Sequence, residues 1–201
     1  LVNWDTKLQT AISDLEVVQK DVQSNLYFIN YPIEGSSENI TIATTRPETM
    51  MGDTAIAVNP KDERYKSLIG KNVLIPLVNR TIKIIGDHYA DPDQGTGAVK
   101  ITPAHDFNDY DVGKRNKLNI INILEKNGSI NKNGIKEFVG LDRFEARKLL
   151  TKRLKENGYL AKIENIKNKV PYRDRSNSNI EPLLTKQWFV YAKKKDKKPI
   201  Q

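Results

Sequence analysis

The chain has 201 residues, a formal net charge of +8 and no cysteine, so one or two domains are expected and disulfides, thiol nucleophiles and thiolate-bound zinc are excluded. No apolar run reaches the roughly 20 residues that a membrane helix needs, and Leu1 to Asp5 show no signal-peptide pattern, so we expect a cytoplasmic protein without a membrane partner. Positions 1–113 hold 10 basic and 16 acidic residues, whereas positions 114–201 hold 23 and 9. The basic half indicates either a polyanionic partner such as nucleic acid or a lysine-rich solvated surface.

Runs of β-branched and aromatic residues, separated by turn-forming residues, predict a series of strands over the first half of the chain. The link 32–38 contains Pro, Gly and two Ser, as a hairpin loop does. A short helix is predicted at 62–65, directly after Asn59-Pro60. Strands are predicted at 26–31, 39–44, 54–58, 73–75, 81–85 and 98–102.

The second half alternates helices with strands. A helix is predicted at 106–116 and strands at 119–124 and 159–166. The clearest helix is predicted at 143–157, where the apolar residues share one face, Asp142 with Glu145 forms a capping-box pattern and Gly158 marks the end.

Closely spaced strands with about three helices predict a mixed α/β fold with a β-barrel or rolled-sheet core and peripheral helices. The order of elements does not resemble a repeating βαβ array, and no internal repeat is visible. The lysine-rich tail at 193–199 is expected to be mobile.

The first segment with possible chemistry runs from Thr44 to Thr49, directly after a predicted strand. Pro47 suits the first turn of a short helix, and Thr45 can cap that helix. Hydroxyls and backbone N–H groups would then converge with Arg46, an arrangement that suits an oxyanion or a sugar hydroxyl. Taken alone, the segment is explained better as an ordinary strand-to-helix cap.

The second segment runs from Gly95 to Tyr110. Lys100 and Thr102 lie two apart on a strand, so their side chains point to one face. Asp106 and Asp109 lie three apart on a helix and also share a face. A strand end and a helix start would thus present an ammonium, a hydroxyl and two carboxylates to one pocket. The alternative is that Asp106 caps the helix and Asp109 complements the helix dipole.

Other chemistry at this segment is less well supported. His105, Asp106, Asp109 and Asp111 could bind a metal, but the nearby Lys100 disfavours a divalent cation. The GxxxxGK[ST] phosphate loop is absent, and Gly95-Thr96-Gly97 alone is no dinucleotide fingerprint. We therefore expect neither a metal nor a cofactor.

Together, residues 42–58 and 95–110 resemble the editing domain of valyl-tRNA synthetases. Glu48 and Gly52-Asp53-Thr54 favour the valine branch over the isoleucine and leucine relatives that share the fold. The resemblance implies a segment leading in from the catalytic domain at 1–25, the editing domain at 26–166, and a return segment with a mobile basic tail at 167–201. The family's ATP-site signatures are absent, so the chain resembles an insertion domain that cannot activate an amino acid.

The resemblance implies post-transfer editing, in which a positioned water hydrolyses the ester of mischarged threonyl-tRNA(Val) without a covalent intermediate. It makes Asp109 the anchor of the substrate ammonium and Asp106 the acceptor of the threonine γ-hydroxyl or the orienter of the water. Lys100 and Thr102 would complete the pocket, and Lys100 could steady the oxyanion.

The resemblance also implies that Thr44, Thr45 and Arg46 hold the terminal adenosine, with His105 as a secondary candidate. Gln94 stands where some members have an aromatic residue beside the adenosine. The implied partners are the 3′ end of tRNA(Val) carrying threonine and the catalytic domain of the same enzyme, and the default state is a monomer. Alternatives are a passive module that binds the tRNA 3′ end and a metal-dependent hydrolase. Candidate phosphate contacts are Lys114, Arg115, Arg143, Arg147 and Lys148.

Overall fold

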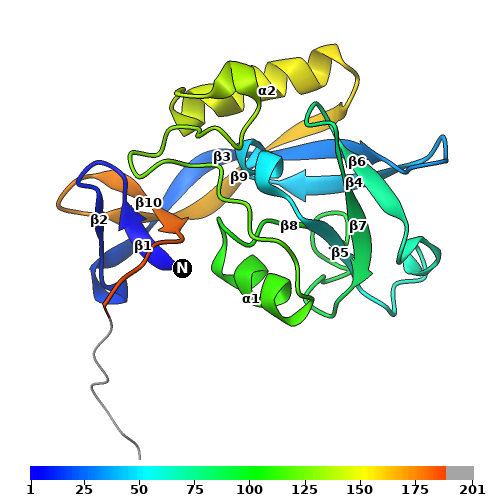
Figure 1. Cartoon of the computed structure of the whole chain (residues 1–201), viewed down its shortest axis with the longest axis horizontal. Coiled ribbons are helices and arrows are strands. Elements are labelled where there is room, and N and C mark those ends of the chain that lie inside the picture. Colours follow the sequence, from blue (N-terminus) through cyan, green and yellow to red (C-terminus); the bar gives the residue numbers. More distant parts are fainter. Residues whose placement is uncertain (189–201) are drawn as a thin grey trace, which may run out of the picture.

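The strands form two sheets (Figure 1). The larger sheet combines strands from both ends of the sequence, whereas the smaller sheet is formed by four consecutive strands. The computed structural model describes residues 1–188, and within them a six-stranded sheet has the order β2-β1-β10-β9-β3-β4 and a four-stranded sheet the order β6-β7-β5-β8. The strands are β1 Val2–Asp5, β2 Thr10–Ala11, β3 Val17–Pro32, β4 Asn39–Thr44, β5 Ala55–Val58, β6 Asn72–Ile75, β7 Arg80–Gly86, β8 Ala98–Ile101, β9 Leu160–Arg173 and β10 Ser178–Leu183. The helices are α1 Phe107–Arg115 and α2 Arg143–Glu156, with short 3-10 turns η1 Asp14–Glu16, η2 Pro47–Gly52, η3 Lys66–Leu68 and η4 Lys136–Phe138.

The two long strands β3 and β9 connect two parts of the molecule (Figure 1). They pair antiparallel from Val17 opposite Arg173 to Ile29 opposite Leu160. Their outer ends carry β1, β2 and β10, and we call residues 1–25 and 167–183 the arm and residues 26–166 the body. The predicted boundaries, after residues 25 and 166, lie two pairs apart on this ladder, since Asn165 and Ile166 pair with Asn25 and Ser24.

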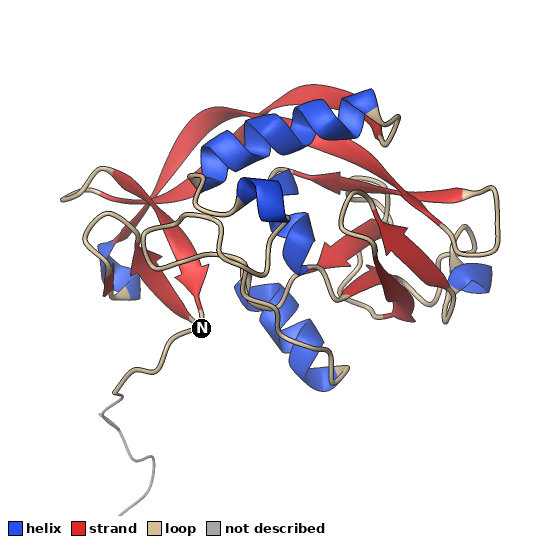
Figure 2. Cartoon of the chain, turned by 45° about the horizontal axis from the view of Figure 1, so that its top comes forward, coloured by secondary structure: helices blue, strands red, loops and turns tan. Residues whose placement is uncertain are grey.

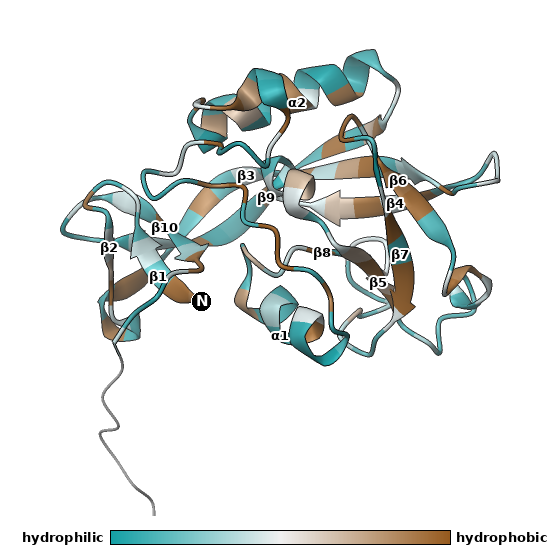
Figure 3. Cartoon of the chain, viewed as in Figure 1, coloured by the Kyte–Doolittle hydropathy of each residue, from teal (hydrophilic) through white to brown (hydrophobic). Residues whose placement is uncertain are grey.

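The four-stranded sheet is built around β5, which pairs parallel with β7 and antiparallel with β8. All four residues of β5 are fully buried, which explains their uniformly apolar character and the brown colour of β5 in Figure 3. An isolated bridge between Ile33 and Val73 joins the two sheets. The mixed α/β class is confirmed, but across residues 1–188 the strands make two sheets and not one closed barrel.

Within the body, helix α2 packs against η2 and β9 (Figure 2). Ala146, Leu150 and Leu154 are fully buried at the spacing of one helical face. The Asp142 side chain caps the helix by accepting the Phe144 N–H at 2.8 Å. The predicted helix, its apolar face and its Asp142 cap are confirmed, but the Glu145 side chain makes no return bond to the Asp142 backbone, so the capping box is not formed.

The predicted strand at 119–124 is wrong, because only Leu124 takes part in an isolated bridge, with Ile130. Side chains satisfy this backbone in place of a sheet: the Ile123 N–H donates to His105 Nε2 at 3.0 Å, and the Leu124 N–H donates to the Asn122 side chain. The segment instead passes over the body as an extended loop.

The short helix predicted at 62–65 is also wrong, because a turn occupies these residues and the 3-10 turn η3 begins only at Lys66. The Asp62 side chain accepts the Arg64 N–H at 3.0 Å, which favours a turn over a helix. No helix in residues 1–188 has both the length and the apolar character to cross a bilayer. The tail at 193–199 lies outside the described residues.

Candidate active site

The corner between β8 and α1 brings the predicted catalytic side chains together. Lys100 Nζ donates to Thr102 Oγ1 at 2.6 Å, and the Thr102 backbone N–H donates to Asp109 Oδ2 at 2.9 Å. Pro103 ends the strand, and Gly113 lets α1 lie against this proline, since a Cβ there would stand 2.6 Å from Pro103 Cγ. An ammonium, a hydroxyl and a carboxylate therefore meet in one buried cluster.

Asp106 is the N-cap of α1, as the structural alternative proposed. Its Oδ1 accepts the N–H groups of Asn108 at 2.8 Å and of Asp109 at 3.1 Å. The cap fixes the first turn of α1 and hence the position of Asp109. Asp106 is half-buried and also lines a cleft, so capping leaves its carboxylate accessible.

Lys100 has further partners that the sequence analysis missed. Its ammonium donates to Thr49 Oγ1 at 2.7 Å and lies 3.5 Å from Asp53 Oδ1. Asp53 also accepts from Thr102 Oγ1 at 2.7 Å and from the Tyr31 hydroxyl at 2.8 Å. The only signal in the sequence was the Gly52-Asp53-Thr54 motif, because the pairing of these residues across the body is a tertiary property.

Asp109 is 6% exposed, and this burial raises the pKa of its carboxyl to about 7. Lys100 opposes that effect and the Asp106 carboxylate adds to it. The carboxyl thus changes its charge near neutral pH, as groups at functional sites often do.

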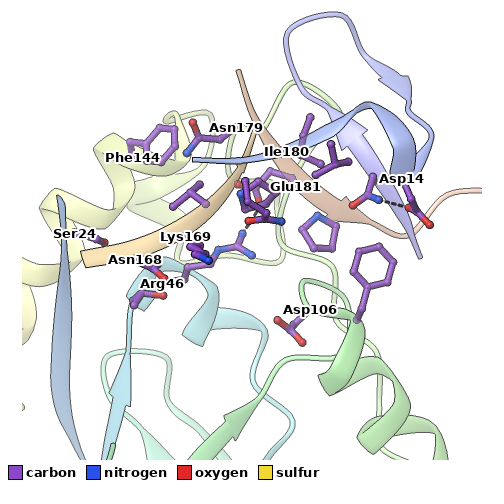
Figure 4. A pocket seen from close by; sticks show the side chains of 18 of the residues that line it. Asp14, Ser24, Arg46, Asp106, Phe144, Asn168, Lys169, Asn179, Ile180 and Glu181 are labelled. Atoms are coloured by element: carbon purple, nitrogen blue, oxygen red, sulfur yellow. Dashed lines mark hydrogen bonds and ion pairs between the residues drawn. The ribbon is translucent and has the colours of Figure 1, made fainter. Parts of the chain in front are cut away.

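A cleft of about 720 Å³ lies between the arm and the body (Figure 4). On the body side it is lined by Thr45, Arg46 and Asp106, and Figure 4 shows Arg46 between Glu181 and Asp106. The arm contributes residues of β9 and β10. Lys100, Thr102 and Asp109 are not among the residues that line the cleft.

Arg46 is held in place by two carboxylates. Its Nη2 donates to Glu181 of β10, its Nε lies 3.6 Å from Glu48, and its Nη1 donates to the His105 carbonyl at 2.9 Å. Burial alone would lower the pKa of Arg46, but the charges of Glu181 and Glu48 outweigh burial and raise it. Arg46 therefore stands as a fixed cation between the cleft and the β8–α1 corner.

The predicted cap of η2 by Thr45 is wrong, because the N-cap is Arg46 and no side chain caps it. Thr44 is buried, and its Oγ1 accepts the Arg46 N–H at 3.1 Å. Thr45 is half-buried at the edge of the cleft. Thr44 thus orients Arg46, while Thr45 faces the cleft.

His105 is buried, and its environment keeps the imidazole neutral. Burial lowers its pKa to about 3, and the charges of Arg46 and Lys100 act in the same direction. Because Nε2 accepts the Ile123 N–H, the ring proton is on Nδ1, which has no hydrogen-bond partner within residues 1–188. His105 consequently serves as a structural acceptor at this corner.

The five predicted phosphate contacts are placed differently. Arg143 is 4% exposed and donates to Glu181 at 2.8 Å, and Arg147 binds Glu48 through two bonds of 2.7 Å. Arg115 is exposed but binds Asp87. The placement of these three arginines favours internal ion pairs over phosphate contacts. Lys114 and Lys148 are exposed.

Gln94 lies on the exposed loop before β8, and its side chain donates to Asp91 at 3.1 Å. In residues 1–188, no three His, Asp or Glu side chains gather into a group that could hold a metal ion. The arrangement at the β8–α1 corner can bind a cationic amine through Asp109 and polarise an ester through fixed positive charge.

A family model places the chain in a known class: the chain belongs to the class I tRNA synthetases (I, L, M and V), whose model matches residues 1–201. It is 69% identical over 194 residues to the valine–tRNA ligase of Pelagibacter ubique (strain HTCC1062), a match that covers 96% of this chain and 22% of that enzyme. The valine–tRNA ligase of Francisella tularensis subsp. tularensis (strain SCHU S4 / Schu 4) is 56% identical over 192 residues, with 96% and 21% covered. The resemblance to the valine branch is confirmed, and the chain spans about a fifth of the length of these relatives.

The crystal structure of a LeuRS-tRNA-LeuAMS ternary complex from Agrobacterium radiobacter K84 has a similar fold. The TM-score is 0.54 at 22% sequence identity, with 79% of this chain and 21% of that chain covered. At this identity the comparison supports the fold alone.

Proposed function

We propose that the chain is the editing domain of a valine–tRNA ligase and hydrolyses the ester of threonyl-tRNA(Val). The observation that carries the proposal is the convergence of Lys100, Thr102 and Asp109 beside the cleft that Arg46 and Asp106 line. The domain would act in the cytoplasm with the catalytic domain of the same enzyme, as a monomer.

The need for such a site follows from the shapes of the two amino acids. An apolar pocket cannot strongly reject an isostere that adds a hydroxyl, and valyl-tRNA synthetases facing threonine are themselves the known case. A polar site reverses the preference, because valine would put a methyl group against a hydrogen-bonding group. Leaving one such buried group unpaired costs roughly 1–3 kcal/mol.

In the proposed reaction, the Asp109 carboxylate binds the substrate α-ammonium through charge-assisted hydrogen bonds. Asp106, at the cleft, accepts a hydrogen bond from the threonine γ-hydroxyl or from the attacking water. The fixed charges of Lys100 and Arg46 favour the oxyanion that develops on the ester carbonyl.

The water oxygen bonds to the carbonyl carbon, and the bond from that carbon to the ribose oxygen breaks. A water proton passes to the ribose oxygen, and free threonine leaves. No covalent bond to the protein is needed, since an aminoacyl ester is already labile and requires mainly a positioned water.

The cleft suits the terminal adenosine of the tRNA. Thr45 and Arg46 line it, and Phe107 on α1 offers an aromatic face there that could replace the one missing at Gln94. Of the predicted phosphate contacts, we retain Lys114 and Lys148, because both are exposed.

The test is to incubate the 201-residue chain with threonyl-tRNA(Val) and valyl-tRNA(Val), each with and without a chelator. We expect the threonyl ester to be lost at least about tenfold faster than the valyl ester, because one unpaired buried polar group is worth that factor. Chelation should leave both rates unchanged.

Binding of threonyl-tRNA(Val) without turnover would contradict hydrolysis and support a passive module that binds the tRNA end. Chelator-sensitive loss would instead support a metal-dependent hydrolase. Equal loss of the two esters would contradict the proposed selection of threonine.

A further inference from the structure

Tyr31 and Asp53 lie behind the proposed catalytic cluster and belong to none of the roles above. Tyr31 is on β3 and Asp53 directly follows η2, and both are fully buried. The Tyr31 hydroxyl donates to Asp53 Oδ2 at 2.8 Å, while Asp53 Oδ1 accepts from Thr102 at 2.7 Å and lies 3.5 Å from Lys100 Nζ. One carboxylate therefore links a side chain of β3 with two side chains at the end of β8.

The position of Asp53 is itself tightly determined. Gly52 packs so closely on the 119–124 loop that a Cβ would stand 2.8 Å from the Ile121 carbonyl oxygen. Arg80 donates to the carbonyls of Met51 at 2.8 Å and Asp53 at 2.6 Å, which holds this turn from the other side. The carboxylate is thus presented to Lys100 and Thr102 from a rigid support.

The hydrogen bonds also fix the directions of two hydroxyl protons. Thr102 accepts from Lys100 and donates to Asp53, whereas Thr49 accepts from Lys100 and donates to the Arg46 carbonyl at 2.9 Å. Each hydroxyl has used its single proton inside the protein, so both are held in one orientation around the Lys100 ammonium.

We infer that Tyr31 and Asp53 are positioning residues, which hold the ammonium of Lys100 and the hydroxyl of Thr102 in the arrangement of the proposed site. The inference rests on the proposed function, because Lys100 and Thr102 belong to the cluster that carries it. Tyr31 acts through Asp53, which in turn acts through Lys100 and Thr102.

A purely structural role for the tyrosine is the competing explanation. Burial, followed by the charge of Asp53, raises the pKa of Tyr31 well above its usual value, so the phenol remains a donor at any working pH. A structural hydroxyl would affect only the fraction of folded protein. A positioning hydroxyl would affect the rate of each folded molecule, and more strongly while Lys100 is present.

The experiment compares Tyr31→Phe, Lys100→Met and the double variant in the 201-residue chain. Tyr31→Phe should lower kcat for threonyl-tRNA(Val) about tenfold, as expected for loss of a hydrogen bond to a charged group, with a smaller change in KM. In the Lys100→Met background the same change should have a clearly smaller effect, because only the path through Thr102 remains. Tyr172→Phe is the matched control, because its ring lies on β9 in the arm, over Lys20.

A second measurement does not depend on activity. The side-chain nitrogen resonance of Lys100, observed by NMR after labelling with nitrogen-15, should shift in Tyr31→Phe and stay unchanged in Tyr172→Phe. If the parent chain proved inactive while the resonance shifted, the proposed function would fall and the positioning would stand. An unchanged resonance, or equal effects of Tyr31→Phe with and without Lys100, would overturn the inference.

Discussion

At the scale of single residues, Asp109 decides how the proposed site responds to pH. Its raised pKa, about 7, means that the carboxylate that would anchor the ammonium is lost in mild acid. The neighbouring His105 has a pKa of about 3 and stays neutral throughout that range. Of these two buried groups, only Asp109 changes its charge between pH 5 and pH 8, so only Asp109 should shape the pH profile of hydrolysis in that range.

We predict that kcat/KM for threonyl-tRNA(Val) falls about tenfold per pH unit below about pH 7, because only the ionised carboxyl of Asp109 binds the substrate ammonium. Initial rates between pH 5 and 8 give the profile. His105→Gln serves as the control: whatever it does to the rate, it should leave the midpoint of the acid limb in place. If the midpoint of the acid limb moved in His105→Gln, the limb would not report the ionisation of Asp109 alone, and this prediction would be wrong.

The same carboxyl should cost stability at neutral pH. The folded-state pKa of Asp109, about 7, lies above the ordinary value of 3.8, so the contribution of this group is complete below about pH 3.8 and is lost as pH rises through 7. Asp109→Asn keeps an acceptor for the Thr102 N–H and removes the charge. It should raise the free energy of unfolding at pH 8 by up to about 4 kcal/mol, the equivalent of the full shift.

Urea unfolding of the parent and Asp109→Asn at pH 8 and pH 4 measures this effect. The stability difference should shrink toward zero at pH 4, where the parent carboxyl is also neutral in the folded state. The variant should lose threonyl-ester hydrolysis by about a hundredfold, as expected for a lost charge-assisted contact. A variant less stable than the parent at pH 8 would contradict the burial argument.

At the scale of elements, α1 carries one aspartate that caps it and another that faces Lys100, and the two roles can be separated. Asp106→Asn keeps a capping oxygen, so the free energy of unfolding should change little. Asp106→Ala removes the cap and should cost about 1 kcal/mol. Thermal unfolding of both variants measures this difference.

Hydrolysis should fall in both variants of Asp106, because neither retains the carboxylate at the cleft. Since Asp106→Asn keeps the cap, its loss of activity isolates the role of the charge from the position of the helix. Full activity in Asp106→Asn would show that capping is the only function of this residue.

The local part of this site was predictable from the sequence, whereas its support was not. The pairing of Lys100 with Thr102 follows from the two-residue period of a strand, and α2 followed from its apolar face and cap. Tyr31 and Asp53 reach the cluster only through tertiary hydrogen bonds, from Tyr31 on β3 to Asp53 after η2 and from Thr102 after β8 to the same carboxylate. The prediction of a strand at 119–124 was wrong for a similar reason: a tertiary contact, the hydrogen bond from the Ile123 N–H to His105, takes the place of strand pairing.

At the scale of the whole molecule, charged side chains join the arm to the body beside the cleft. Glu181 of the arm binds both Arg143 of α2 and Arg46, and Arg46 in turn lies near Glu48, which binds Arg147. Burial by itself would raise the pKa of Glu48, but Arg147 and then Arg46 outweigh it and lower that pKa. The sequence-based prediction of phosphate contacts at Arg143 and Arg147 did not consider these ion pairs, because the carboxylate partners of the two arginines are far away in the sequence.

Glu181→Ala should therefore act on stability and activity together. Removing one partner of a buried ion pair leaves its cations uncompensated, which costs about 3 kcal/mol, and here both Arg143 and Arg46 lose their shared carboxylate. Because Arg46 lines the cleft, threonyl-ester hydrolysis should fall with it. Hydrogen exchange should also increase along β10, since the strand loses its link to the body.

The matched control is Glu164→Ala, which breaks an ion pair on β9 whose partners, Lys162 and Glu164, are 55% and 46% exposed. An exposed pair contributes at most about 1 kcal/mol, so this variant should keep both the stability and the activity of the parent. If Glu181→Ala behaved like Glu164→Ala in unfolding, hydrolysis and hydrogen exchange, the ion pairs of Glu181 would not connect the arm to the site. Loss of stability without loss of hydrolysis would show that Arg46 keeps its place through Glu48 and the His105 carbonyl alone.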